Sequence, residues 1–383
     1  MRLNPLILSV FCLLPSARST AQNMDGKEIG KLVVGVVLPM SGPQAAYGVE
    51  ALTGIKLAME DIARDHPQYH QLIRILVGDD KSTASGAETA AKSLIRRRAS
   101  IFLGSVTRTN SASLARVAKE FHKPLVIPAN SSLPLRNPSP LIFRSCALDR
   151  WQGYLLGEFA SKTLGKTNAA ILLDPKDHLA HDVAEHFTRN FRRNGGKISL
   201  REMYQRGSQN TDFKGRISKI GQSGAQVILF PTSDVEEAAA VMTELRRQKI
   251  NIPLLGLDRW NTPRLGRTAG PAYPGHFYIL PFSSAEPGAA TQNFVSRFKA
   301  RTRRFPSALA AMAYDAMLLV ADSFKRAGTS RAKELARAIK RTHNLKGLLG
   351  PVSINANQTA EKSGVVMMTT GRGSQAKALV HPM

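Results

Sequence analysis

The chain has 383 residues, of which 43% are hydrophobic and 21% are charged. This length and balance suit two ordinary domains that bury sizeable cores, and they exclude a disordered chain. Two cysteines are too few for a disulfide framework, which excludes the small disulfide-stabilised class of secreted protein.

The formal net charge is +25 at pH 7, and such a field favours anionic surfaces or ligands. The basic residues occur in small groups along the chain, for example Arg96 to Arg98 and Arg192 to Arg193. No zinc-finger spacing, RNA-binding signature or basic zipper accompanies them. We interpret these groups as solvated helix faces and expect no nucleic-acid partner.

The first residues differ in character from the rest. Arg2 precedes an almost wholly apolar run from Leu6 to Leu14, and small residues follow up to Ala21. This pattern predicts a secretory signal peptide over residues 1–21, cleaved near Ala21, and therefore a periplasmic protein. An anchor is the less favoured alternative, because the run is shorter than the roughly 20 residues that span a bilayer.

Strands alternate with helices in the first third of the chain. Leu32 to Leu38 is a short apolar run bounded by Pro39, and the segment from Gly48 to Ile62 has apolar residues at helical spacing. The same unit recurs, with strands expected at 72–77, 101–103 and 125–127 and helices at 86–95 and 111–121. This alternation predicts a parallel sheet with helices on both faces.

The alternation starts again after Asp149. Strands are expected at 169–173, 227–230 and 254–256, with helices at 183–191 and 235–247. Three further helices, at 291–305, 308–327 and 331–341, precede short strands at 352–354 and 365–369. The strands and helices between residues 169 and 256 predict a second lobe with its own parallel sheet, and the later helices do not simply extend that lobe.

An ordered set of motifs resembles the leucine/isoleucine/valine-type periplasmic binding proteins over Lys31 to Thr369. The pieces are the segment from Gly35 to Gly48, Asp79-Asp80, Pro128 to Ser132, Phe143-Arg144, Gln152-Gly153, Asp212-Phe213 and Tyr314 to Ala316. Each piece is weak alone, and the specificity of the resemblance lies in their order.

The resemblance implies an α/β fold with two doubly wound parallel-sheet lobes joined by a hinge of three crossings, the type I periplasmic binding protein fold. The crossings would lie near Asp149, Pro281 and Gly350. Lobe 1 would comprise residues 31–148 and 283–350, and lobe 2 residues 149–282 and 351–383. A ligand would be enclosed between them, where helix N-termini suit a carboxylate.

The resemblance also implies residues that hold an amino acid's head group. Tyr47, in the loop after the first strand, would form an aromatic wall, although it could instead pack under the turn. Ala129 and Ser131 would offer a carbonyl and a hydroxyl, with Ser132 adjacent, although this segment is also ordinary turn chemistry. Asp258 would face the ligand's ammonium group, and an ion pair with Arg259 is its alternative.

The sequence departs from the family where a serine usually meets the ligand carboxylate. Here the segment is Thr107 to Ser111, and two interpretations stay open. Either Arg108 pairs with the carboxylate through two parallel hydrogen bonds, or it points to solvent while Thr107 or Thr109 takes the serine's part.

The second-lobe loops that resemble the family's side-chain pocket carry no aromatic residue. The first loop contains His178 and the second contains Asp234, which we take as candidate ligand contacts. We therefore expect a ligand side chain more polar or charged than that of leucine.

No metal or other cofactor is expected. His178 lies close in sequence to four more candidate ligands, which are His181, Asp182, Glu185 and His186. No second cluster completes a site, and polar helix surface explains the group. The enzyme motifs sought, including a nucleophile elbow and a Walker loop, are absent. We therefore do not expect an enzyme.

The function that the resemblance implies is the substrate-binding component of an ABC-type importer. It would capture an amino acid or amino-acid-like molecule by hinge closure and deliver it, as a monomer, to a membrane permease. The alternative is a ligand-sensing receptor of the same fold that controls a regulatory partner. The predicted signal peptide favours transport.

Overall fold

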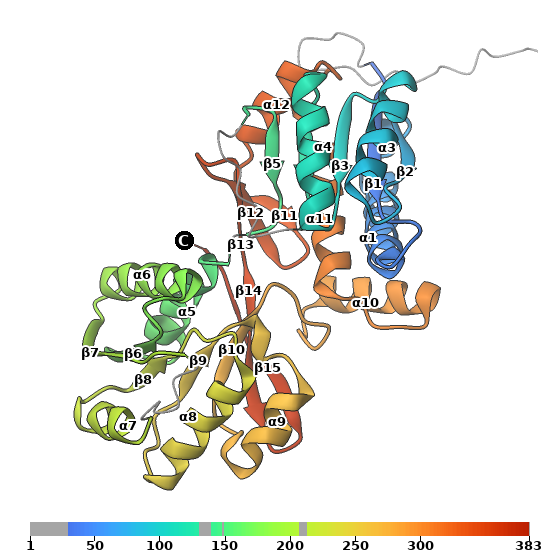
Figure 1. Cartoon of the computed structure of the whole chain (residues 1–383). Coiled ribbons are helices and arrows are strands. Elements are labelled where there is room, and N and C mark those ends of the chain that lie inside the picture. The colour runs from blue at the N-terminus through green and yellow to red at the C-terminus, as the bar shows by residue number, and fades with distance from the viewer. Residues whose placement is uncertain (1–29, 130–138, 148, 207–212, 383) are drawn as a thin grey trace, which may run out of the picture.

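The computed structural model describes residues 30–129, 139–147, 149–206 and 213–382. Two α/β lobes lie one above the other and are joined where extended segments pass between them (Figure 1). The predicted signal peptide, Ser131, Ser132 and Asp212 lie outside the described residues. Within the described ranges, no helix combines the length and apolar character needed to cross a membrane.

The first lobe is built on five parallel strands in the order β2-β1-β3-β4-β5. β1, at Leu32–Leu38, has six of its seven residues buried, because helices cover both faces of the sheet. The other strands are β2 Ile73–Asp79, β3 Ile101–Gly104, β4 Leu125–Ile127 and β5 Ile142–Arg144.

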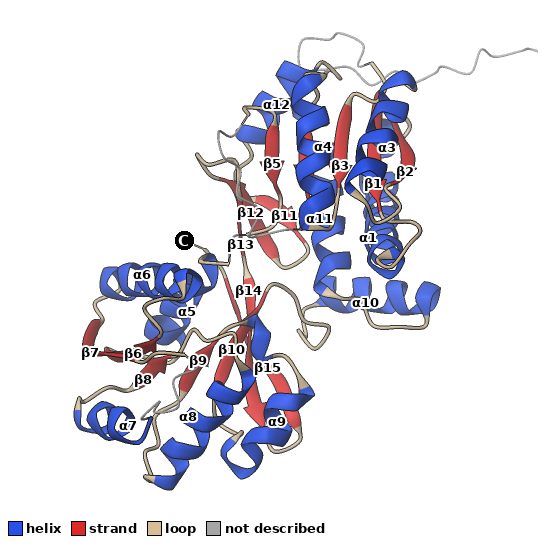
Figure 2. Ribbon diagram, in the orientation of Figure 1, coloured by secondary structure: helices blue, strands red, loops and turns tan. Residues whose placement is uncertain are grey.

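Two pairs of helices cover this sheet (Figure 2). α3 (Ala84–Arg96) and α4 (Arg108–Glu120) pack on one face. α1 (Ala45–Asp65) and α11 (Ala308–Ala327) pack on the other, so α11 returns to the first lobe as the resemblance implied. The remaining helices of this lobe are α2 Pro67–His70, α10 Ala289–Thr302 and α12 Ala332–Lys340.

The second lobe is built on seven strands in the order β15-β14-β10-β9-β8-β6-β7. β6 to β10 run parallel, whereas β14 is antiparallel to both β10 and β15. The strands are β6 Asn168–Leu173, β7 Lys197–Met203, β8 Val227–Leu229, β9 Leu254–Gly256, β10 Phe277–Leu280, β14 Gly364–Thr370 and β15 Gly373–Val380.

Helices again cover both faces of the second sheet. α5 (Trp151–Glu158), which continues into a π-helical turn, packs with α6 (His178–Arg193) on one face. The other face carries α7 Phe213–Gln222, α8 Val235–Arg247 and α9 Pro263–Ala269. The sequence therefore predicted the doubly wound character of both lobes from its alternating apolar runs.

The chain passes between the two large sheets three times. The passages lie between β5 and α5, between β10 and α10, and between β13 and β14. The third passage differs from the expected one near Gly350, because Gly350 begins β12 of a separate three-stranded sheet. That sheet comprises β11 Leu345–Gly347, β12 Gly350–Ile354 and β13 Ala360–Lys362.

The three-stranded sheet is tied to the first lobe. The Arg144 backbone N–H of β5 donates to the Gln358 carbonyl at 2.9 Å, and Arg144 forms a parallel bridge with Thr359. The chain therefore leaves for the seven-stranded sheet only at Ser363, directly before β14.

The packing of α1 against α11 predicts a sensitive glycine. A Cβ added at Gly54 of α1 would lie 2.1 Å from the Ala310 carbonyl oxygen of α11. We expect Gly54→Ala to lower the free energy of unfolding by about 1–3 kcal/mol, because α1 and α11 must move apart to accommodate the methyl group. Urea unfolding measures this change. Gly371→Ala is the matched control, since a Cβ there meets nothing within 4 Å. An unchanged unfolding midpoint in Gly54→Ala would contradict this packing.

His276 predicts a loss of stability in acid. Its Nδ1 accepts a hydrogen bond from the Leu254 backbone N–H at 3.1 Å, and its Nε2 lies 3.1 Å from the Ala272 carbonyl, which requires a neutral ring. Burial lowers the pKa of His276 from 6.5 to about 4. The unfolded chain therefore binds more protons between these values, and stability present above pH 6.5 is lost as the pH falls towards 4.

We expect the His276 contribution to cost about 2 kcal/mol of unfolding free energy between pH 7 and pH 5. Urea unfolding at both pH values measures it. His276→Asn, which keeps an acceptor for Leu254, should flatten this pH dependence, whereas His122→Asn on the exposed surface should not. Equal pH slopes in wild type and His276→Asn would show that another group is responsible.

Candidate functional site

The lobes meet around a small pocket of about 140 Å³. All three passages between the sheets contribute to it, and Met312 from the start of α11 closes one side. The polar residues of this hinge pocket are Asp149 and Gln152 from the first passage, Asp258 after β9, and Lys362 and Ser363 from the third passage. Any rotation of one lobe against the other must therefore act at these residues.

Asp258 is an acidic residue of the hinge pocket. Its backbone N–H donates to the Gln152 side-chain oxygen at 3.0 Å, which fixes the turn that carries it. Burial, and then the neighbouring carboxylate of Asp149, raise the pKa of Asp258 above its ordinary value, while Arg259 opposes them. The Asp258 carboxylate is thus placed where a cation would stabilise it.

Lys362 does not supply that cation. It is half of an ion pair with Asp315 of α11, in which both side chains are largely buried. Asp315 in turn accepts the Leu348 backbone N–H at 2.8 Å. The positive charge of Lys362 is therefore committed to the first lobe, although the residue lines the same pocket as Asp258.

The N-terminus of α4 offers a site for an anion. Thr107 is its N-cap, but the Thr107 hydroxyl makes no capping bond, and its oxygen is buried without a partner in the described part of the chain. The Asn110 Nδ2, in the first turn, is likewise buried and unpartnered there. The free backbone N–H groups of the first turn, the helix dipole and the Thr107 hydroxyl could together bind a carboxylate.

Arg108 and Thr109 lie on the outside of that turn. Both are exposed, whereas Thr107 is partly buried. Of the two interpretations open from the sequence, this geometry favours Thr107 in the serine's place. Ala129 is buried at the end of β4, next to β3, so it and Thr107 follow neighbouring strands at the same edge of the sheet.

Tyr47 lies differently from the sequence prediction. It belongs to the first turn of α1 rather than to the preceding loop, because the helix begins at Ala45. Its side chain is 54% exposed, so it does not pack under the turn. Gln44, which caps α1, has a buried side-chain oxygen without a partner among the described residues.

The second-lobe candidates lie at helix N-termini. Asp234 caps α8, and its carboxylate accepts the backbone N–H groups of Glu236 at 2.8 Å and Glu237 at 3.3 Å. His178 begins α6 and is exposed, while Asp177 caps that helix. The Asp234 carboxylate therefore has a structural role as a helix cap, and the sequence alone could not distinguish this role from contact with a ligand.

Sequence reasoning missed a partly buried polar network at the ends of β7 and β8. Glu237 accepts the Tyr204 hydroxyl and the Thr232 hydroxyl, each at 2.7 Å. Arg206 donates to Thr232 at 3.1 Å and forms ion pairs with Glu237 and Asp177. Its members come from three separate segments, which follow the adjacent strands β8, β6 and β7, so only these positions after the strands could have signalled it.

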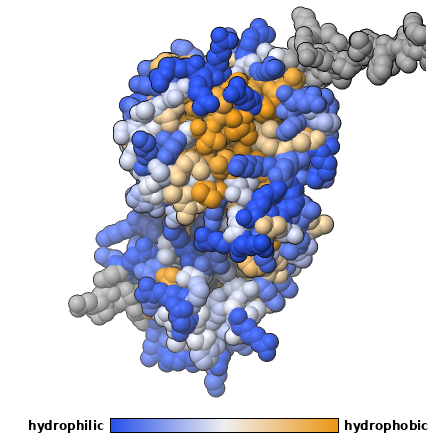
Figure 3. Space-filling model, turned by 90° about the vertical axis from the view of Figure 1, so that its right-hand side faces the viewer, coloured by the Kyte–Doolittle hydropathy of each residue, from blue (hydrophilic) through white to orange (hydrophobic). Residues whose placement is uncertain are grey.

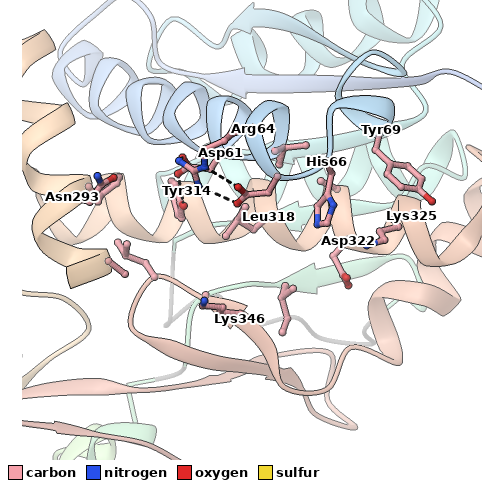
Figure 4. A pocket seen from close by; sticks show the side chains of 18 of the residues that line it. Asp61, Arg64, His66, Tyr69, Asn293, Tyr314, Leu318, Asp322, Lys325 and Lys346 are labelled. Carbon is pink, nitrogen blue, oxygen red and sulfur yellow. Dashed lines mark hydrogen bonds and ion pairs between the residues drawn. The ribbon is translucent and has the colours of Figure 1, made fainter. Parts of the chain in front are cut away.

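A larger pocket of about 570 Å³ lies elsewhere on the first lobe, between α1, α10, α11 and β11 (Figure 4). Asp61 on its wall accepts the Tyr314 hydroxyl at 2.7 Å and pairs with Arg64 and Arg297. These contacts satisfy the carboxylate and brace the three helices. The pocket flanks the helices rather than the ends of the strands.

In the described residues no group of three or more histidine, cysteine, aspartate or glutamate side chains is placed to hold a metal ion. The histidines of α6 are spread along its surface, where His186 Nδ1 contacts the Asp182 carbonyl at 2.8 Å.

Comparison with known proteins places this geometry in context. The family model described as periplasmic binding protein matches residues 31–374. The Leu/Ile/Val-binding protein homolog 1 of Brucella suis biovar 1 is 24% identical over 355 residues, covering 92% of this chain and 94% of the relative.

Solved structures share the fold. The leucine binding protein LivK of Thermotoga maritima is 26% identical with a TM-score of 0.59, covering 92% of this chain and 99% of that one. A solute binding protein of an ABC transporter from R. palustris, in complex with benzoate, is 22% identical with a TM-score of 0.57, covering 92% of this chain and 97% of that one.

Proposed function

Because the chain belongs to the periplasmic binding protein family, we propose that it is the extracytoplasmic substrate-binding component of an ABC-type importer. It has the type I periplasmic binding protein fold, and it is a binding protein rather than an enzyme. Its ligand, in this proposal, is an amino acid or an amino-acid-like molecule.

The unsatisfied N-terminus of α4 is the observation that carries this proposal. In the part of the chain that the structure describes, the Thr107 hydroxyl is buried without a partner, which is costly, and a ligand carboxylate bound by Thr107 and the free N–H groups would remove that cost. Asp258 offers the complementary charge at the hinge, where burial leaves it in need of a cation. One carboxylate site and one ammonium site match the two charges of an amino acid.

Ligand capture then follows from the arrangement of the lobes. The carboxylate would dock on α4, and closure of the second lobe would bring the loops of His178 and Asp234 over the ligand, with Tyr47 at the rim of the first lobe. The described side chains of these loops are polar, which favours a polar ligand side chain. Closure needs only a few kcal/mol of difference between open and closed states.

We propose the division into lobes as residues 31–148 and 283–362 for the first and 149–282 and 363–383 for the second. The last boundary is set at Ser363 rather than Gly350, because β12 and β13 pair with β11 and lie against β5. We also propose that a cleaved signal peptide exports the protein to the periplasm and that the protein delivers its ligand to a membrane permease. The alternative function is that of a ligand-sensing receptor of the same fold.

Aromatic carboxylates are a second ligand class, since the R. palustris relative binds benzoate. Such ligands have no ammonium group and would not use Asp258. A thermal-shift screen of the purified protein against amino acids, benzoates, sugars and nucleosides decides between the classes. A ligand at 100 times its dissociation constant should stabilise the protein by about 2.7 kcal/mol. Shifts with sugars or nucleosides alone would refute the proposal.

Thr107→Val should weaken the affinity for the carboxylate ligand found by the screen roughly 10- to 100-fold, because it removes a hydrogen bond to a charged group and keeps the shape. Isothermal titration calorimetry measures the dissociation constants. Arg108→Gln, on the exposed side of the same turn, is the matched control and should change the affinity at most a few-fold. The reverse order of effects would instead assign the carboxylate to Arg108.

Asp258→Asn should weaken an amino-acid ligand more than about 100-fold, because the ammonium group loses its buried partner. A benzoate-type ligand should keep its affinity in the same variant.

In the wild type, affinity for an amino acid should fall as the pH falls through the raised pKa of Asp258, since only the ionised carboxylate attracts the ammonium. Titrations at several pH values test this, and unchanged amino-acid binding by Asp258→Asn would remove the residue from the site.

A further inference from the structure

One edge of the first sheet is open. β2 pairs with β1 over all seven residues from Ile73 to Asp79, and no described strand pairs with its other side. Figures 1 and 2 show β2 at the outer margin of the upper lobe. The strand contains no proline and no register shift, and Arg74 is the only cation in it.

The other three edges of the two large sheets are protected. Edge strand β15 carries Lys377, and a register shift interrupts its pairing with β14. β5 is only three residues long and is bridged to Thr359 of the small sheet. β7 carries three charged residues, Lys197, Arg201 and Glu202, and a register shift interrupts its pairing with β6. These are the usual means by which proteins block pairing of sheet edges. β2 has no register shift and no bridge to another sheet, and its charged residues are Arg74 and, at its end, Asp79.

Apolar side chains continue from β2 onto the neighbouring helix. On β2, Val77 is 39% exposed and Ile75 is partly exposed. On α1, Val49 is 49% exposed; Leu52 follows three residues later and Met59 seven residues after Leu52, which keeps the three on one helix face. Figure 3, which shows this side of the molecule, has a continuous apolar surface on the upper lobe.

We propose that this face, formed by β2 and the Val49, Leu52 and Met59 side of α1, binds a second copy of this chain. Two identical strand edges related by a two-fold axis pair antiparallel, and a two-fold axis needs only this one face on each copy. With the axis at Leu76, Ile75 lies opposite Val77 of the second copy, and Arg74 lies opposite Gly78, which leaves room for its guanidinium group. The two five-stranded sheets then form one ten-stranded sheet.

The proposed interface does not use the candidate ligand residues. On the first lobe, Thr107 follows β3, which β1 separates from β2, and Tyr47 lies two residues before Val49 on α1 and so on a different face of that helix. Asp258, the hinge pocket and the second-lobe loops lie elsewhere. The inference therefore does not depend on the proposed function, and it replaces the expectation of a monomer. Because each copy carries a formal charge of +25, the association should weaken at low salt, where repulsion is least screened.

Sedimentation velocity of the purified protein over a wide concentration range, at low and at high salt, tests the proposal. We expect a species of twice the monomer mass that increases with concentration and with salt. Val77→Lys should weaken the association at least tenfold, because it places a charge opposite Ile75 of the second copy. Met203→Lys is the matched control, since Met203 is 53% exposed on edge strand β7 and should leave the dimer intact.

Ligand affinity and thermal stability of Val77→Lys should equal those of the monomeric wild type, which separates the interface from a folding defect. Amide hydrogen exchange of the wild type should slow at Ile73 to Asp79 as the concentration rises. A wild type that is monomeric under all conditions would overturn the proposal, and so would a dimer that survives Val77→Lys. Binding only to lipid vesicles, without self-association, would also overturn it.

Discussion

Three passages of one chain between two sheets, meeting around a single small pocket, are the constraint on which the rest of this structure depends. Because β10 and β14 are paired antiparallel, the second and third passages leave the second lobe side by side. Lys362 is held by Asp315 at the first-lobe end of the third passage. The third passage is therefore anchored to the first lobe. Asp258 lines the pocket between the passages, so a rotation of one lobe against the other would change its contacts.

The alternating apolar runs predicted the doubly wound lobes, since strands buried on both faces must be apolar. β7 at Lys197–Met203 and β15 at Gly373–Val380 escaped prediction because both are partly exposed and carry polar residues. The third passage was placed too early, because its position near Gly350 was implied only by the family resemblance, and β12, which begins there, pairs with β11 and β13. Whether such a strand joins one sheet or another is decided by tertiary pairing rather than by local pattern.

The candidate site was predictable only in part. Thr107 and Arg108 are neighbours in sequence, and only the helix start decides that one is partly buried and the other exposed. Asp149 and Gln152 could not be linked to Asp258 from the sequence, because more than a hundred residues separate them and the fold alone brings them together. Asp234 was expected at the ligand from its sequence position, and the structure shows that its carboxylate caps α8.

The packing of α1 against α11 has a consequence for the order in which the protein folds. The core of the first lobe joins residues 45–65 to residues 308–327, with the whole second sheet except β14 and β15 lying between them in sequence. A growing chain thus cannot complete its N-terminal lobe until most of its length has been synthesised. The first lobe of such a chain therefore stays incomplete during most of synthesis, and the export proposed above would use a polypeptide in that unfolded state.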